Sequence, residues 1–314
     1  MNHVDFGVFL SPELLDYPEL ERRAKYVEKQ GFHSIWISDH LLGIYTTPSA
    51  PRLEGWTALT ALAAKTSRVR LGHLTLAVPF RNPALLAKMA ATLDVLSEGR
   101  AILSIGAGWH EREFKAFGYR FGDLRSRSDR LEEAAAIIKK MMTEEKPSYS
   151  GEYYSIYEAY NEPRPVQEGG VPLMIAGEGE KRTLRTCAVY GDMSNYAVWR
   201  GTSDEFRRKT GVLEAHCHRI GRDPDEICKS WPAFTFVDSS DEAAERNAEN
   251  YYKETGAGGV GGLIGSPEAL IQRIYEYVDA GARMFILSFL GPSWRREVDL
   301  FTEKVVPEFG KSSR

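Results

Sequence analysis

The sequence predicts an α/β fold, a closed (β/α)8 TIM barrel with insertions after the fourth and seventh strands. Strand-like and helix-like segments alternate along almost all of the 314 residues, which is typical of a parallel sheet. The strand candidates are short apolar runs, as expected for strands buried on both faces. Eight such units fit a barrel of this length. An open doubly wound sheet would normally carry a Gly-x-Gly-x-x-Gly turn after its first strand, where this chain has Leu10-Ser11-Pro12-Glu13.

The individual elements follow from apolar runs for strands and from helical periodicity between them. Strands are expected at residues 4–9, 34–37, 69–75, 101–105, 173–176, 193–197, 231–237 and 285–289. Helices are expected at residues 18–30, 56–66, 83–96, 129–142, 180–190, 203–220, 241–254, 267–280 and 298–306. Residues 149–160 interrupt this alternation and predict an irregular or hairpin insertion. No low-complexity linker divides the chain, and the Gly-rich segment 256–262 is compatible with a hinge inside one domain, so residues 1–314 are interpreted as a single domain.

The composition excludes several classes of function. The chain is 43% hydrophobic and 27% charged, which is ordinary for a soluble globular protein. A net charge of −4 argues against a nucleic-acid partner. No run approaches the ~18 apolar residues that span a bilayer, and the N-terminus lacks signal-peptide features. Three cysteines without paired spacing indicate a reducing, cytoplasmic location. No metal is expected at His216-Cys217-His218, because adjacent residues of a helix diverge by about 100°.

Two of the expected strands end in residues suited to a bound ligand. Asp39 and His40 follow the second strand, where one side chain can face the barrel mouth while the other braces a loop. Histidine is the residue type most often used as an acid or base near neutral pH. A plain surface loop with Asp39 as a cap is an equally good interpretation of this pair. The fourth strand ends in Gly106-Ala107-Gly108-Trp109. Its glycines let a flat ligand approach the backbone, and Trp109 offers an aromatic wall.

A glycine-rich segment follows the fifth strand and leads into a helix: Ala176-Gly177-Glu178-Gly179-Glu180-Lys181. Free N–H groups at a helix start bind anions, and Lys181 adds positive charge. The alternative is a simple strand-to-helix turn, and the P-loop pattern is absent. The acidic residues Glu111 and Glu113, which follow Trp109, are expected to lie on a solvated face or to pack against the insertion.

Together these motifs resemble the luciferase-like flavin oxidoreductase family, and most closely its branch that uses the deazaflavin coenzyme F420. The resemblance is carried by residues 36–41, Glu54 with Trp56, and residues 66–72, 81–88, 92–94, 97–100, 106–109, 129–133, 177–185 and 190–192. It covers nearly the whole chain. One departure is Trp109, because the sugar-phosphate dehydrogenase branch has a glutamate there; an aromatic residue suits a less polar substrate or shapes the pocket.

The resemblance implies a barrel mouth that holds a flavin-like ring. A non-prolyl cis peptide near Leu74-Thr75 would support the back of the ring, and residues 177–181 would hold the cofactor phosphate. The expected cofactor-binding residues are Asp39, Leu74, Thr75, Gly106, Ala107, Gly108, Trp109, Ala176, Gly177, Glu178, Gly179, Glu180 and Lys181. His40 would lie at the reactive edge of the ring as proton donor or acceptor.

The resemblance also implies a homodimer and leaves the reaction open. Apolar helix faces that could meet a second copy include Leu59, Leu62 and Ala63, and Leu85, Met89 and Leu93, although such faces also cover any barrel. The first interpretation is an F420-dependent oxidoreductase that moves a hydride to or from a small organic substrate. The alternative is an FMN-dependent monooxygenase that uses reduced flavin and O2. The two reactions are distinct, because reduced deazaflavin reacts poorly with oxygen. A non-catalytic flavin-binding protein is a third possibility, against which the intact motifs count.

Overall fold

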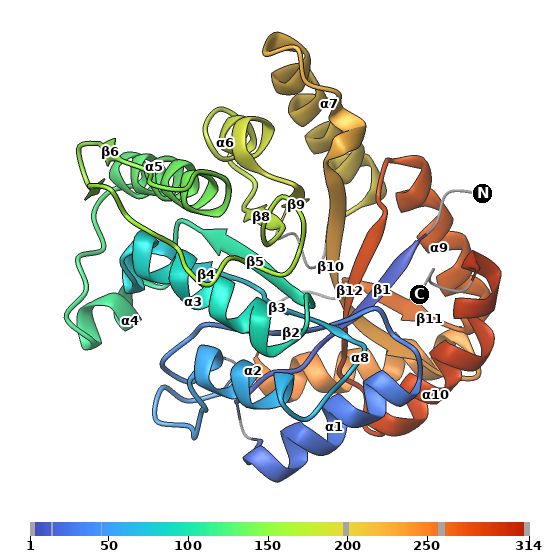
Figure 1. The fold of residues 1–314 in the computed structure, drawn as a ribbon. Helices are drawn as coiled ribbons and strands as arrows, with labels where there is room; N and C mark the ends of the chain where they lie inside the picture. Colours follow the sequence, from blue (N-terminus) through green and yellow to red (C-terminus); the bar gives the residue numbers. More distant parts are fainter. Residues whose placement is uncertain (1–3, 14, 45, 197–200, 257–260, 311–314) are drawn as a thin grey trace.

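Eight parallel strands close into a barrel, which confirms the predicted (β/α)8 architecture (Figure 1). The computed structural model describes residues 4–13, 15–44, 46–196, 201–256 and 261–310. The ring follows the order β1 (Asp5–Phe9), β2 (Ser34–Ile37), β3 (Arg70–His73), β5 (Ala101–Gly106), β8 (Leu173–Ala176), β9 (Met193–Asn195), β10 (Cys228–Val237) and β12 (Met284–Phe289). It closes because β12 pairs with β1, in a register that places Phe6 opposite Phe285.

Helices follow these strands and surround the barrel. They are α1 (Tyr17–Lys29), α2 (Gly55–Ala63), α3 (Pro83–Leu96), α4 (Glu111–Ala116), α5 (Leu124–Thr143), α6 (Thr183–Tyr190), α7 (Ser203–Arg219), α8 (Asp241–Thr255), α9 (Pro267–Asp279) and α10 (Trp294–Lys304). Short 3-10 turns occupy Val78–Phe80, Pro224–Glu226 and Val306–Phe309. Local sequence sets several starts: the side chains of Asp16, Glu54 and Asn82 accept hydrogen bonds from the first N–H groups of α1, α2 and α3. In the described part of the chain, no helix is long and apolar enough to cross a membrane.

The boundaries of two strands differ most from the prediction. The expected strand at residues 69–75 is β3 followed by the two-residue β4 (Leu76–Ala77), with the peptide bond between Leu74 and Thr75 in the cis form. The expected strand at residues 231–237 begins earlier, at Cys228, and its first residues pair with β9. The expected end of the sixth strand, Ala197, lies outside the described residues.

Additional elements lie between β5 and β8 and between β10 and β12. The first stretch contains α4, α5 and an antiparallel hairpin of β6 (Tyr149–Ser150) and β7 (Ser155–Ile156). For residues 149–160 the sequence predicts an irregular segment or a hairpin, and the structure has the hairpin. The second contains β11 (Leu263–Gly265), which pairs with the end of β10. Thr235 of β10 pairs with both β11 and β12, so β11 lies on the β10 edge that faces β9.

The barrel interior is filled by large side chains from neighbouring strands. They form a buried cluster of Phe9, Trp36, Ile102, Met174, Met193, Met284 and Ile286. Trp36 needs glycine on both adjacent strands, since a Cβ on Gly7 would lie 2.7 Å from its Nε1 and a Cβ on Gly72 2.5 Å from its ring. The Trp36 N–H donates to Ser34 Oγ at 2.8 Å, so its polar atom is satisfied inside the core. This packing leaves the strand ends as the place for a ligand.

Candidate active site

Residues expected at the barrel mouth come from four strands that are neighbours in the ring, β2, β3, β5 and β8. The cis peptide bond lies at Leu74–Thr75, as the resemblance predicts. The Thr75 hydroxyl hydrogen-bonds with that of Ser104 on β5. A Cβ on Gly106 would lie 2.9 Å from Thr75 Cγ2 and 3.3 Å from the Ala176 carbonyl oxygen. Thr75, Gly106 and Ala176 therefore lie against one another at the strand ends.

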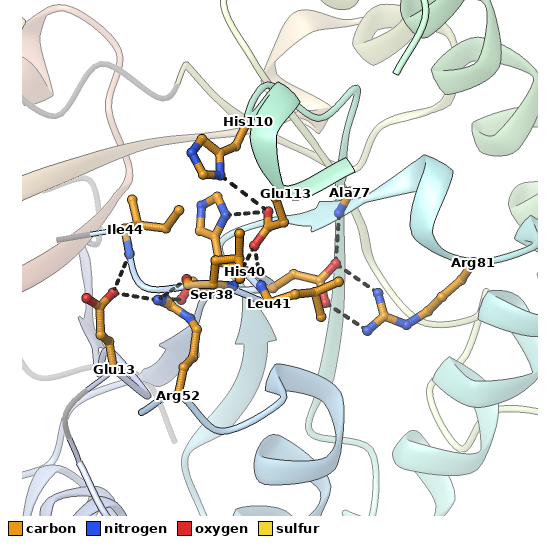
Figure 2. A network of polar contacts seen from close by, with 12 residues as sticks. Glu13, Ser38, His40, Leu41, Ile44, Arg52, Ala77, Arg81, His110 and Glu113 are labelled. Atoms are coloured by element: carbon orange, nitrogen blue, oxygen red, sulfur yellow. Dashed lines mark hydrogen bonds and ion pairs between the residues drawn. The ribbon is translucent and has the colours of Figure 1, made fainter. Parts of the chain in front are cut away.

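His40 is held by a buried carboxylate that sequence reasoning did not assign to the site (Figure 2). Its Nδ1 lies 3.0 Å from Glu113 Oε2, and Glu113 is only 1% exposed. The other oxygen of Glu113 accepts hydrogen bonds from the backbone N–H groups of Leu41 and Leu42, the latter at 2.9 Å. The expectation that Glu113 lies on a solvated face is wrong. The other expectation, that Glu113 packs against the insertion, does not describe its hydrogen bonds either, because these are with residues that follow β2.

The charge state of Glu113 determines which nitrogen of His40 carries hydrogen. Burial by itself would raise the pKa of Glu113, but the hydrogen bonds from His40, Leu41 and Leu42 outweigh it and hold that pKa below its ordinary value. An ionised carboxylate only accepts hydrogen bonds, so Nδ1 of His40 donates. Neutral His40 then has its Nε2 as a proton acceptor, and the side chain is 19% exposed.

Two further rings surround His40 at the start of α4. Trp109 is 63% exposed and meets His40 edge to face, with ring centroids 5.5 Å apart. The ring of His110 lies 6.1 Å from that of His40. Gly108 makes this turn possible: its φ is +77°, and a Cβ there would lie 2.6 Å from the Phe114 ring. The structure thus brings together His40 and Trp109, two residues that the sequence predicts separately for the site.

The buried carboxylate of Asp39 holds together segments at the barrel mouth. Its carboxylate, 2% exposed, accepts two hydrogen bonds of 2.8 Å from the Arg81 guanidinium and one of 3.0 Å from the Ala77 N–H. Arg81 also pairs with Glu54 at 2.8 Å. These contacts connect the end of β2 to β4 and to the segment that follows it. Of the adjacent residues Asp39 and His40, Asp39 is buried in an ion pair, whereas His40 is partly exposed. A direct contact between Asp39 and a cofactor stays a prediction.

A second buried ion pair fixes the loop after β2 (Figure 2). Arg52 donates to Glu13 Oε2 at 2.7 Å and to Ser38 Oγ at 2.7 Å, and both side chains of the pair are 2% exposed. Glu13 also accepts from the backbone N–H groups of Ile44 and Thr46, at 2.9 and 3.1 Å. Sequence reasoning missed this pair because the two residues lie in separate loops with no local motif.

The glycine-rich segment after β8 is packed against α6 and α7. Gly177 has φ +132°, and its N–H donates to the Asn195 carbonyl at 2.8 Å. A Cβ on Gly177 would lie 3.1 Å from Thr183 Cγ2, and one on Gly179 would lie 2.8 Å from Thr183 Oγ1. Buried Lys209 donates to the Glu178 carbonyl at 2.8 Å and lies 3.2 Å from Glu180 Oε1. The glycines thus accommodate Thr183, while phosphate binding by residues 177–181, with exposed Lys181, stays a prediction.

Comparison with known proteins agrees with this architecture. A model of the family described as luciferase-like monooxygenase matches residues 4–262. The F420-dependent glucose-6-phosphate dehydrogenase of Kineococcus radiotolerans is 42% identical over 158 residues, which are 50% of this chain and 45% of that protein. In this alignment the chain spans about half the length of its relative. The enzyme of that name from Microbacterium testaceum is 27% identical over 98% of this chain and 97% of its own.

Solved structures share the fold at lower identity. An F420-dependent secondary alcohol dehydrogenase, in complex with an F420–acetone adduct, matches with a TM-score of 0.84 and 21% identity, covering 97% of this chain and 98% of that one. The coenzyme F420-dependent tetrahydromethanopterin reductase of Methanopyrus kandleri matches with a TM-score of 0.82 and 21% identity, covering 98% and 100%. Since the family model covers residues 4–262 of the 314, this chain belongs to the luciferase-like monooxygenase family.

Proposed function

We propose that this chain is an F420-dependent oxidoreductase, which transfers a hydride between the deazaflavin coenzyme and a small organic substrate. The observation that carries the proposal is the His40–Glu113 pair at the barrel mouth, with Nδ1 and Oε2 3.0 Å apart. The relatives support the choice of coenzyme, because their names describe F420-dependent dehydrogenases, among them a hydroxymycolic acid dehydrogenase of Mycobacterium tuberculosis that is 29% identical over 80% of this chain.

The residues at the mouth fit a flat ring. Gly106 leaves room for the Thr75 side chain, since a Cβ there would lie 2.9 Å from Thr75 Cγ2, and Thr75 with its small neighbours is proposed to support the flat face of the ring. The exposed indole of Trp109 offers a wall beside His40. Leu74, Ala107 and Gly108 complete the residues proposed to hold the ring, and residues 177–181 those proposed to hold the phosphate. When bound, the coenzyme supplies the hydride acceptor or donor.

His40 supplies the proton chemistry that hydride transfer requires. Oxidation of an alcohol to a carbonyl removes a hydride and also the hydroxyl proton, which Nε2 of His40 can accept. Glu113 keeps Nδ1–H pointing away from the substrate and stabilises the imidazolium that forms. In the reverse direction the same nitrogen returns the proton. The apolar Trp109 surface next to His40 favours a substrate less polar than a sugar phosphate.

Equilibrium binding of purified F420 and FMN distinguishes this function from the FMN-dependent monooxygenase alternative. We expect F420 to bind and FMN to bind at least 100-fold more weakly, measured by fluorescence titration under identical conditions. Tight FMN binding without detectable F420 binding would overturn the proposal.

We further propose a homodimer built on the outer face of α2 and α3, in the cytoplasm. Leu59, Leu62, Ala63 and Leu93, expected for this contact, are buried within the chain and leave almost no surface for a second copy. The supporting residues are instead Leu85 and Leu96 of α3, which are 55% and 59% exposed. Leu96 and Met89 line a groove of about 150 Å³ with Trp56 of α2. The free cysteines, Cys187, Cys217 and Cys228, suit a reducing compartment.

Light scattering on the chain and on a Leu85→Glu, Leu96→Glu variant tests this dimer. We expect a dimer for the chain and a folded monomer for the variant. A monomeric chain at working concentrations would overturn the proposal.

A further inference from the structure

Three side chains of metal-binding type converge at the start of α4. Glu113 Oε2 lies 3.0 Å from His40 Nδ1 and 3.9 Å from His110 Nδ1, and the three ligand atoms all lie within 4.8 Å of one another. His110 and Glu113 are three residues apart, a spacing that brings both side chains to one side of a helical turn. His40 reaches the same point from the end of β2 (Figure 2).

His110 has no evident role in the proton chemistry proposed for His40. Its Nδ1 is buried, yet within the described residues it has no hydrogen-bond partner. Buried polar atoms are nearly always paired, so an isolated one that points at a carboxylate calls for an explanation. A bound cation between the two would satisfy both groups.

Glu113 is also oriented as a metal-binding carboxylate would be. Its Oε1 is fixed by the backbone N–H groups of Leu41 and Leu42, which leaves Oε2 to face the two histidines. Such hydrogen bonds to the second oxygen are the usual support of a metal-ligating carboxylate.

We propose that His40 Nδ1, His110 Nδ1 and Glu113 Oε2 form a binding site for a divalent transition-metal ion, with Zn²⁺ as the best match. Bonds of roughly 2.0–2.2 Å in a tetrahedral site require ligand atoms about 3.3–3.5 Å apart. The two separations from Glu113 Oε2, 3.0 and 3.9 Å, lie on either side of this value, and all three ligand atoms are within 4.8 Å, so side-chain rotations that bring the histidine nitrogens together complete the site. Two imidazoles and one carboxylate favour Zn²⁺ over Mg²⁺, which prefers oxygen ligands. A water molecule would be the fourth ligand.

Occupancy of this site would inhibit the enzyme. The ion would take the Nδ1 and the carboxylate oxygen that otherwise hold His40 in place. This consequence rests on the proposed function, whereas metal binding itself does not, and the two can therefore be tested separately.

Calorimetric titration of the full chain with ZnCl2, in the absence of coenzyme and substrate, tests the site. We expect one ion per chain with micromolar or tighter affinity, no competition by MgCl2, and a tetrahedral absorption spectrum when CoCl2 is used instead. Glu113→Gln and His110→Ala should each weaken Zn²⁺ binding at least 30-fold. His218→Ala, which removes an exposed histidine of α7, is the matched control and should bind as the chain does. Thermal unfolding verifies that each variant is folded.

Absence of binding at millimolar Zn²⁺, or unchanged binding in both folded variants, would overturn the site. If Zn²⁺ binds as expected but the chain turns over no substrate with F420, the proposed function fails and the metal site stands. In an active chain, Zn²⁺ should abolish turnover at the concentration at which it binds, and EDTA should restore it. Full turnover with the site saturated would refute the inhibitory role.

Discussion

Glu113 Oε2 lies 3.0 Å from Nδ1 of His40, a residue 73 positions earlier in the chain. The contact joins the end of β2 to the first turn of α4. Because the carboxylate is buried and also accepts backbone hydrogen bonds from Leu41 and Leu42, it fixes the orientation of the imidazole before any substrate arrives. This relationship joins His40 and Glu113 into one structural unit, and the role proposed for each can be tested separately.

Replacing His40 with alanine should lower the rate of hydride transfer by 10²- to 10⁴-fold, the usual contribution of general acid–base catalysis. Coenzyme affinity should change by less than about threefold, because the imidazole is proposed to meet the substrate rather than the phosphate of the coenzyme. The measurement is single-turnover hydride transfer at saturating coenzyme. A wild-type rate in this variant would refute the assignment and make Trp109 and His110 the next candidates.

Glu113→Gln should reduce kcat by about 10- to 100-fold with little change in KM for the coenzyme, since the residue acts through His40. The sharper measurement is the double variant with His40→Ala. If Glu113 only positions His40, the second substitution adds nothing once His40 is gone. Additive losses in kcat would mean that Glu113 contributes independently of His40.

Asp39→Ala should lower the free energy of unfolding by about 3–5 kcal/mol, because it leaves Arg81 without its buried partner. Both hydrogen bonds between the two side chains are 2.8 Å long. Lys115→Ala is a suitable control, since its pair with Glu111 is largely exposed and should be worth no more than ~0.5 kcal/mol. Urea denaturation measures both. A loss in Asp39→Ala no larger than the control would contradict the bracing role.

The phosphate assignment is best tested at Lys181 rather than at the glycines. Valine at Gly177 would strain a backbone with φ +132° and press on Thr183, so lost binding would not identify the ligand site. Lys181→Ala should weaken F420 binding about tenfold, most strongly at low salt, through loss of a charge-assisted contact. A deazaflavin fragment without the phosphate should bind both proteins equally. Equal F420 affinities of the chain and the Lys181→Ala variant would mean that Lys181 does not contact the phosphate.

Glu297 of α10 should make the protein less stable as the pH rises from about 4.5 to about 8. Burial raises the pKa of this carboxyl from 4.5 to about 8. Between these values the folded state binds a proton that the unfolded state has lost, so the unfolding free energy falls by up to about 1.4 kcal/mol per pH unit. Glu297→Gln should flatten this dependence, and Glu303→Gln, an exposed site on the same helix, should not. An unchanged slope in Glu297→Gln would contradict the prediction.

The barrel could be predicted because its signals are local. Apolar runs that end near Phe9, Ile37 and Ile105 define buried parallel strands, and helical periodicity between them requires a closed or layered α/β sheet. Ligand-binding residues of such folds follow the strand ends, so His40 and Trp109 could be proposed as site residues from their positions, and their role in binding stays a prediction. The cis bond at Leu74–Thr75 came from the family resemblance rather than from these patterns.

The partners of these residues depend on contacts between distant segments. Glu113 has the sequence surroundings of an exposed helical acid, and only the meeting of α4 with the end of β2 makes it a buried partner of His40. Leu59 and Leu62 likewise belong to an apolar face, but periodicity states only that a face is buried, not whether a barrel or a second subunit covers it. The polarity of a residue and its spacing in the sequence indicate whether its side chain is buried. Which residue it contacts is decided by the packing of the whole chain.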